Sequence, residues 1–307
     1  MRRWLLLLWC LAALDVLALE PGKIMSAADL AGFPQPAPTA RIAYGNQALQ
    51  FGDLRIPDGP GPHPLAIFIH GGCWLSAYDI SHSAKLTQAL ADSGIAVWSV
   101  EYRRVGDPGG GWPGSFRDVG KAADHLRELA TQYPLALDRV VAIGHSAGAH
   151  FALWLAVRDQ IPPEHALAAP EPLPIAAVLG LAPAADLGFL HQQQVCGQVI
   201  DGLIGGSPDR YPERYRWADP ARFALPGLMQ VMVIGAHDRA WAPVGERYLA
   251  VAQARNDQVR RVDAPESGHF EMIDPDSSTW PLIRDWVHQL VSVGGGQLPA
   301  ADKQSDE

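Results

Sequence analysis

The most constraining feature of this chain is a short apolar run that ends in a serine flanked by glycines. Residues 140–143 read Val-Val-Ala-Ile, a pattern typical of a buried strand, and residues 147–157 are rich in helix formers. Between them, residues 144–148 read Gly-His-Ser-Ala-Gly, which matches the G-x-S-x-G pattern of a nucleophile elbow. The sequence therefore predicts a tight strand-to-helix turn with Ser146 at its tip.

The two glycines, Gly144 and Gly148, are what such a turn requires. A serine on a very tight turn has a strained backbone, and side chains two positions to either side would collide with neighbouring backbone. The turn lifts the Ser146 hydroxyl clear of the sheet, and the new helix directs its first amides toward whatever binds there. We predict Ser146 as a nucleophile. The alternative is a glycine-rich connection with an incidental serine, because five-residue patterns recur by chance.

Strand and helix patterns alternate along most of the chain, which predicts an α/β fold. This alternation favours a mostly parallel, doubly wound sheet that binds its ligand at the carboxyl ends of the strands. We expect strands at 41–44, 49–56, 65–69, 95–100, 140–143, 175–181, 230–234 and 259–262, and helices at 83–93, 116–130, 147–157, 244–255 and 279–291.

Composition separates a main domain from its flanking segments. Residues 40–293 carry the alternating pattern, whereas the proline-rich residues 20–39 predict an extended lead-in. Residues 186–223 are polar and break the alternation, so we expect a cap-like excursion over the site, part loop and part short helix. Residues 294–307 are rich in glycine and then acidic, which predicts a disordered tail.

Charge and composition bound the expected partners. The 307 residues carry a formal net charge of −9 without a long Lys/Arg run, so nucleic acid is not an expected partner. Apolar residues make up 48% of the chain, which supports a sizeable core. The sequence contains neither a metal-ligand spacing nor a dinucleotide fingerprint, so neither a metal nor a cofactor is expected.

Residues 1–19 have the pattern of a secretory signal peptide. Arg2 and Arg3 precede an apolar stretch, and a small-residue cleavage site follows Ala18. The stretch is too short to cross a membrane, so no stable span is expected after its removal. We therefore expect export to the periplasm or to the outside of the cell. The alternative is a true start at Met25 and a cytoplasmic protein.

Three cysteines are present, and Cys10 leaves with the predicted signal peptide. Cys73 and Cys196 then remain as the one possible pair. A disulfide between them can form in an oxidising compartment, but the sequence does not give their separation in space. We expect two unpaired, partly buried thiols.

A serine nucleophile needs a positioned base, which is itself oriented by a carboxylate. On a fold with a nucleophile elbow, the chain order is serine, acid, histidine. Asp238 follows the predicted strand at 230–234, and His269 follows the one at 259–262. Both therefore lie on loops just past strand ends. We predict Ser146, Asp238 and His269 as the catalytic triad.

Three other histidines compete for the role of base. His145 and His150 lie on the elbow and its helix, too local in the chain to reach round to the serine. His237 is adjacent to the predicted acid, and would need Asp186 or Glu266 as its orienting carboxylate.

The third requirement is an oxyanion hole of N–H donors. The amide of Ala147, at the start of the helix, supplies one donor. Residues 70–74 read His-Gly-Gly-Cys-Trp and follow a predicted central strand, and paired glycines let the backbone turn its amides inward. We expect Gly72 and Cys73 as donors, with Gly71 making the turn. The alternative is a His-Gly-Gly turn without a catalytic role.

Together, these motifs resemble the α/β-hydrolase superfamily, and within it the HGG-type carboxylesterases and the arylformamidase (kynurenine formamidase) branch. The resemblance covers residues 54–290 and rests on His70, Gly71, Gly72, Trp74, Gly144, His145, Ser146, Ala147, Gly148, Asp238, His269 and Phe270. It implies an α/β-hydrolase fold, a mostly parallel central sheet flanked by helices. Cys73 stands where HGGG-type lipases have glycine, which keeps the backbone amide and narrows the acyl side of the pocket.

The resemblance implies a serine hydrolase that cleaves a small carboxylic ester through an acyl-enzyme intermediate. A carboxylesterase acting on acetyl or aryl esters is our leading hypothesis, and an arylformamidase using the same triad is the second. A non-catalytic binding protein on a hydrolase scaffold is the remote alternative. Trp112, Trp241 and Phe270 lie on loops at the active end, where they are expected to line the pocket or simply to close the core.

Overall fold

A single eight-stranded sheet organises the protein, for which a computed structural model describes residues 23–292. The predicted signal peptide (1–19) and tail (294–307) lie outside the described residues. The strand order is β1-β2-β4-β3-β5-β6-β7-β8. The first two pairings, β1 with β2 and β2 with β4, are antiparallel, and all the others are parallel. The predicted α/β class and mostly parallel sheet are confirmed.

The strands are β1 (Ala40–Ala43), β2 (Phe51–Arg55), β3 (His63–Ile69), β4 (Ala96–Val100), β5 (Leu135–His145), β6 (Ala177–Leu181), β7 (Met229–Gly235) and β8 (Val259–Ala264). The helices are α1 (Ala84–Asp92), α2 (Gly114–Asp124), α3 (Leu126–Leu129), α4 (Ala147–Leu155), α5 (Leu187–Gln193), α6 (Val199–Ile204), α7 (Pro212–Ala218), α8 (Ala242–Ala254) and α9 (Trp280–Ser292).

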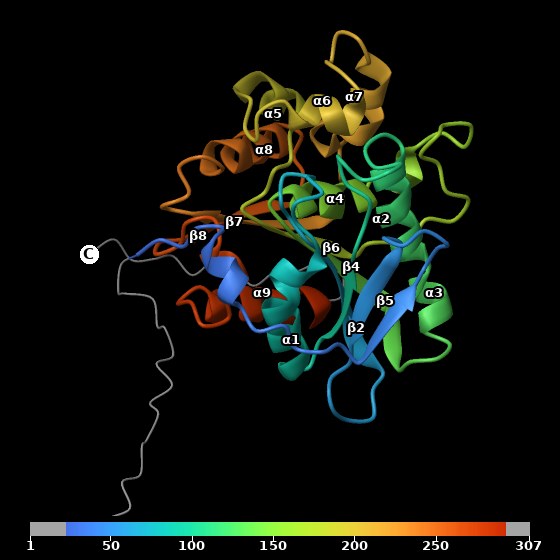
Figure 1. Ribbon diagram of the computed structural model, residues 1–307, viewed down its shortest axis with the longest axis vertical. Coiled ribbons are helices and arrows are strands. Elements are labelled where there is room, and N and C mark those ends of the chain that lie inside the picture. Colours follow the sequence, from blue (N-terminus) through green and yellow to red (C-terminus); the bar gives the residue numbers. More distant parts are fainter. Residues whose placement is uncertain (1–22, 293–307) are drawn as a thin grey trace, which may run out of the picture.

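Helices cover both faces of the sheet and bury its alternating side chains. Along β3, Leu65 and Ile67 belong to the core on the side of α2, α4 and α8, whereas Ala66 and Phe68 belong to the core beneath α1 and α9. Figure 1 shows α1 and α9 on one side of the strands and α4 and α8 on the other. Burial on both faces explains why these strands read as continuous apolar runs rather than alternating ones.

The parallel strands bring distant loops to one edge of the sheet. Ile69, at the end of β3, pairs with Gly144 near the end of β5, and Gly235, at the end of β7, pairs with Ala264 at the end of β8. The loops after β3, β5, β7 and β8 therefore leave the same carboxyl edge. That edge is where the sequence places its candidate catalytic residues.

Two segments outside the main alternation contain short helical elements. The lead-in, expected to be extended, contains a 3₁₀ turn at Asp29–Gly32, because the Asp29 carboxylate accepts hydrogen bonds from the backbone and hydroxyl of Ser26. The segment 186–223 forms α5, α6 and α7, which gather at the top of Figure 1. No helix within residues 23–292 has the length and apolarity needed to cross a bilayer.

The expectation of two unpaired thiols is wrong. Cys73 and Cys196 form a disulfide that closes 123 residues of chain, with their Cα atoms 6.0 Å apart. The bond joins the loop after β3 to the loop between α5 and α6. The sequence pattern missed it because the separation depends on how the 186–223 segment packs against that loop.

Candidate active site

Ser146 lies in a strained turn between β5 and α4. Its backbone has φ +54° and ψ −119°, a conformation that residues with a side chain rarely adopt. The Ser146 amide donates to the Leu181 carbonyl at 2.8 Å, and its own carbonyl accepts from the amides of Ala149 and Ala184. These bonds hold the turn in place from two neighbouring segments.

The two glycines of the elbow are required by close packing. A Cβ atom on Gly144 would lie 2.2 Å from the carbonyl oxygen of Gly148. A Cβ atom on Gly148 would lie 2.0 Å from the carbonyl oxygen of Ile69. Because both obstacles are backbone atoms, no side chain fits at either position, as expected for a nucleophile elbow.

Asp238 and His269 form a hydrogen-bonded pair beside this turn. The Nδ1 atom of His269 lies 2.6 Å from Oδ2 of Asp238, and the other carboxylate oxygen accepts from the Trp241 amide at 3.2 Å. Asp238 is only 5% exposed. With Nδ1 held by the carboxylate, Nε2 is the free ring nitrogen. Within the described chain, His269 makes no hydrogen bond to the Ser146 hydroxyl.

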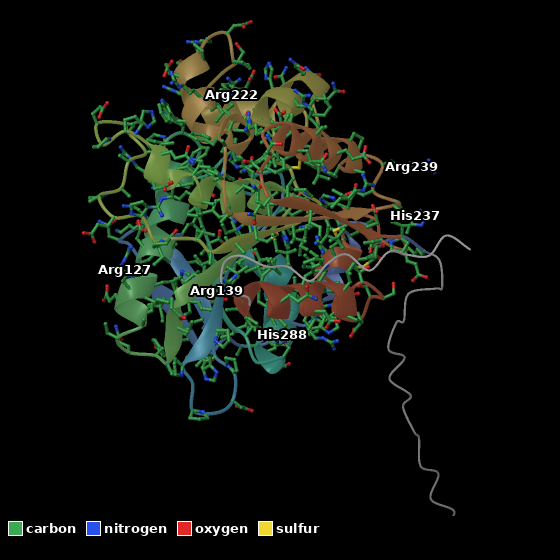
Figure 2. All side chains as sticks on the ribbon, turned by 180° about the vertical axis from the view of Figure 1, so that it is seen from behind. Arg127, Arg139, Arg222, His237, Arg239 and His288 are labelled. Carbon is green, nitrogen blue, oxygen red and sulfur yellow. A yellow bond between two sulfur atoms is a disulfide. The ribbon has the colours of Figure 1, made fainter. Side chains whose placement is uncertain are left out.

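The three competing histidines take other positions. The Nε2 atom of His145 contacts the carbonyl oxygen of His269 at 2.9 Å, and that of His150 contacts the Ala218 carbonyl at 2.8 Å. His237 is exposed and lies at the edge of the molecule, together with Arg239 (Figure 2). Among residues 23–292, none of these three rings pairs with a carboxylate.

The loop after β3 presents free amides to the same region. Gly72, Cys73 and Trp74 all have positive φ angles of 102°, 53° and 54°. A Cβ atom on Gly72 would lie 2.3 Å from Cβ of Tyr78, so the position requires glycine. In the described part of the chain, the amides of Gly72, Cys73 and Ala147 have no hydrogen-bond acceptor. Unpaired amides near a helix N-terminus can bind developing negative charge.

A buried cluster of charged and polar side chains, His70, Glu101 and Arg104, anchors the start of the loop after β3. His70 Nδ1 lies 2.8 Å from the Gly71 carbonyl oxygen, and its Nε2 lies 3.2 Å from Oε1 of Glu101. Burial alone would raise the pKa of the Glu101 carboxyl, but His70 and Arg104 lower it below its ordinary value. Tyr102 stacks on the His70 ring and donates to the His70 carbonyl. Residues 101–103 read Glu-Tyr-Arg, which resembles the strand-end sequence of the same hydrolases, where these residues are structural, and here Glu101 contacts His70.

Two of the three predicted pocket aromatics lie beside His269. The Trp241 ring stacks on His269 at 5.1 Å, and the Phe270 ring packs edge-on at 5.0 Å. Trp112 instead packs on Phe116 at 5.7 Å. The structure therefore brings Trp241 and Phe270, but not Trp112, into contact with His269. Among residues 23–292, no group of three or more potential metal ligands comes together.

Three buried histidines near the site are held neutral. Burial, with a smaller contribution from His70, lowers the pKa of His82 to about 3. Burial lowers the pKa of His150 to about 4. Burial and the neighbouring rings of His269 and His82 lower the pKa of His145 well below its ordinary value. Each of these side chains therefore resists protonation in the folded protein at mildly acidic pH.

We expect the free energy of unfolding to fall as the pH drops below about 6.5. The unfolded chain takes up a proton at each of these three histidines there, whereas the folded chain does not, so each contributes a loss approaching about 1.4 kcal/mol per pH unit. Asp219 acts in the opposite direction, because burial and Asp186 raise its pKa to about 7 and it binds a proton earlier when folded. The net slope approaches about 3 kcal/mol per pH unit near pH 5.

Urea unfolding at a series of pH values measures this slope. His150→Gln removes one of the three histidines, so it should flatten the slope by about 1.4 kcal/mol per pH unit. A free energy of unfolding that stays constant between about pH 7 and pH 5 would contradict the neutral state of the buried rings.

Comparisons with known proteins give a family and several relatives for this chain. The BD-FAE family model matches residues 53–240, more than half of the chain. The chain is 30% identical, over 130 residues, to a probable isoprenylcysteine α-carbonyl methylesterase of Arabidopsis thaliana; the match covers 42% of this chain and 27% of that protein. It is 26% identical, over 266 residues, to esterase LipC of Mycobacterium tuberculosis, covering 81% and 65%. The chain thus spans less than two thirds of the length of either relative.

A solved structure with the same fold is esterase B from Lactobacillus rhamnosis, with a TM-score of 0.71 at 20% identity, covering 84% of this chain and 88% of that one. The segment matched by the family model includes the loop after β3, the nucleophile elbow and Asp238. The chain therefore belongs to the BD-FAE family and has the α/β-hydrolase fold.

Proposed function

We propose that the protein is a serine hydrolase that cleaves small carboxylic esters through an acyl-enzyme intermediate. The observation that carries this proposal is the convergence of three features at one sheet edge. These are the strained turn at Ser146, the hydrogen-bonded pair of Asp238 and His269, and the unpaired amides of the loop after β3. The names of the relatives, a methylesterase and an esterase, support the same reaction class.

In the proposed mechanism, Ser146 attacks the ester carbonyl while His269 Nε2 accepts the hydroxyl proton. Asp238 holds Nδ1 of His269, which fixes the tautomer and stabilises the imidazolium that forms. The amides of Gly72, Cys73 and Ala147 bind the oxyanion. His269 then protonates the leaving alcohol, and afterwards activates the water that hydrolyses the acyl-enzyme.

We infer that the substrate carries a short acyl group or an aryl group. Cys73 is tied to Cys196, so the loop that presents the oxyanion donors is backed by the α5–α6 connection. We expect this arrangement to leave less room on the acyl side of the proposed site than a glycine would. Trp241 and Phe270 supply aromatic surface next to His269, which suits an aromatic leaving group.

The direct test compares purified wild-type protein on p-nitrophenyl acetate, p-nitrophenyl decanoate and N-formylkynurenine. We expect kcat/KM for the acetate to exceed that for the decanoate by about 10-fold or more, because a narrow acyl pocket discriminates against added methylenes. Cleavage of N-formylkynurenine in preference to both esters would favour the arylformamidase alternative. Failure to cleave any of the three would contradict the proposed substrate class.

We also propose that the protein is exported. The signal-like residues 1–19 motivate this proposal, and the disulfide between Cys73 and Cys196 supports it, since disulfides persist in oxidising compartments. N-terminal sequencing of the mature protein tests it. A start shortly after Ala18 is expected, and a start at Met25 would contradict export.

A further inference from the structure

Four histidine rings, those of His70, His82, His145 and His269, lie next to one another in a row that includes the proposed base. The ring centroids of His70 and His82 are 5.7 Å apart, those of His82 and His145 are 5.7 Å apart, and those of His145 and His269 are 4.8 Å apart. The row extends from the loop after β3 to the proposed base. The proposed mechanism uses His269 alone, so the buried His145 and His82 have no assigned role.

His145 makes one directional bond, and that bond reaches the proposed base. Its Nε2 atom lies 2.9 Å from the main-chain carbonyl oxygen of His269. Because a carbonyl oxygen only accepts, Nε2 must carry the proton and donate it. The neutral ring then has an unprotonated Nδ1, which has no partner among residues 23–292. A Cβ atom on Gly71 would lie 3.0 Å from this Nδ1, so the ring fills the space between Gly71 and His269.

The position of His145 in the chain makes this bond informative. His145 immediately precedes Ser146, so its bond to the His269 carbonyl ties the nucleophile elbow directly to the loop of the base. Asp238 holds the His269 ring through Nδ1, which fixes how the ring is turned. The bond from His145 fixes the main chain from which the ring projects. Two separate restraints, one on the ring and one on the backbone, therefore act on His269.

The neutral state of His145 is part of the arrangement. When His269 accepts the serine proton, a positive charge forms 4.8 Å from the centre of the His145 ring. A second charged imidazolium at this distance, in a buried site, would oppose that step. Burial and the nearby rings of His269, His82 and His70 all disfavour protonation of His145. The ring can thus restrain the base without repelling the charge that the base acquires.

We propose that His145 is a positioning residue that holds the backbone of His269 at a fixed distance from Ser146. This inference rests on the proposed function. A misplacement of a catalytic group by about 1 Å can cost about 100-fold in rate, so one restraint of this kind has a measurable effect. We expect the effect to fall on kcat rather than on KM, because the His145 side chain is almost completely buried, at 1% exposure.

The experiment compares two polar replacements of different reach in the full-length protein. The amide nitrogen of glutamine can occupy the place of the ring Nε2 and donate to the His269 carbonyl, whereas asparagine is too short. We expect His145→Asn to lower kcat about 10- to 100-fold at nearly constant KM, and His145→Gln to recover most of it. The pH–rate profile of His145→Gln should keep the wild-type shape, because a neutral His145 adds no ionisation.

His150 supplies a matched control. It is equally buried, neutral at pH 7, and bonded through Nε2 to a backbone carbonyl, but that carbonyl belongs to Ala218 rather than to the base. His150→Asn should therefore lower stability as His145→Asn does, with kcat changed less than about 3-fold. Thermal unfolding of all variants separates loss of folded protein from loss of rate.

Each outcome bears on a defined claim. An inactive wild-type protein contradicts the proposed function itself. An active wild-type protein whose kcat falls equally in His145→Asn and His150→Asn contradicts the positioning role alone. The same holds if His145→Gln is as impaired as His145→Asn, or if an ionisation present in the wild-type profile disappears in His145→Gln.

Discussion

Ser146→Ala is expected to lower kcat for ester hydrolysis by about 10⁶-fold and to abolish labelling by a fluorophosphonate probe. The alanine variant has no oxygen to form the acyl-enzyme, so the remaining residues can only bind the substrate and polarise its carbonyl. The fold should be unaffected, because the strained turn is held by backbone bonds from Ser146 to Leu181, Ala149 and Ala184. Hydrolysis of p-nitrophenyl acetate and gel detection of the probe are the two measurements.

Ser99→Ala is the matched control for this experiment. Ser99 is also a buried serine, at 2% exposure in β4, and its hydroxyl has no hydrogen-bond partner in the described part of the chain. It should keep wild-type labelling and turnover. Labelling that persists in Ser146→Ala, or turnover above about a tenth of the wild-type rate, would show that another group is the nucleophile.

Local sequence patterns predict most of the fold and the elbow because the forces behind them are local. Residues 140–143 lie in the second half of β5. Glycine is required at positions 144 and 148 because a side chain there would collide with backbone atoms of the turn and of β3. Chain order places Asp238 and His269 after β7 and β8, and parallel pairing of these strands brings the two side chains to 2.6 Å. Two residues that are 31 positions apart in the chain are therefore in contact, because the strands that precede them are neighbours in the sheet.

Local sequence patterns do not predict contacts between segments that lack a periodic pattern. The 186–223 segment has no repeat that would reveal which of its residues lies against the loop after β3, so Cys196 was not paired with Cys73. Trp112 follows a glycine-rich loop that turns it toward Phe116, and not toward His269. The bond from His145 to the His269 carbonyl joins residues 124 positions apart. Its acceptor is a main-chain atom, which every residue type has, so the sequence does not indicate this partner.

Removal of the Cys73–Cys196 disulfide is expected to lower the free energy of unfolding by about 5 kcal/mol. The bond closes a segment of 123 residues, and a closed loop of that length restricts the unfolded chain by about this amount in the chain-entropy model. The segment contains β4, β5 and the elbow, so the crosslink spans the central part of the sheet. Urea unfolding of Cys73→Ser/Cys196→Ser against the oxidised wild type measures the change.

Activity should fall along with stability, because the crosslink ends on the proposed oxyanion loop. Cys73 and Trp74 both hold positive φ angles without being glycine, a conformation that persists only where the surroundings enforce it. The disulfide is one such restraint, and the bond from the Val105 amide to the Trp74 carbonyl at 2.8 Å is another. Without the disulfide, we expect kcat to fall about 10-fold, because backbone N–H donors that are less firmly held stabilise the oxyanion less well.

Reduction of the wild-type protein with a phosphine under native conditions provides the chemical counterpart of the double variant. It should lower both the unfolding midpoint and kcat toward the values of Cys73→Ser/Cys196→Ser, while the double variant itself should not respond to the reductant. A wild-type protein whose Cys73 and Cys196 are alkylated before any reduction would contradict the crosslink. A crosslinked protein that loses stability but keeps its kcat on reduction would restrict the disulfide to a role in folding stability.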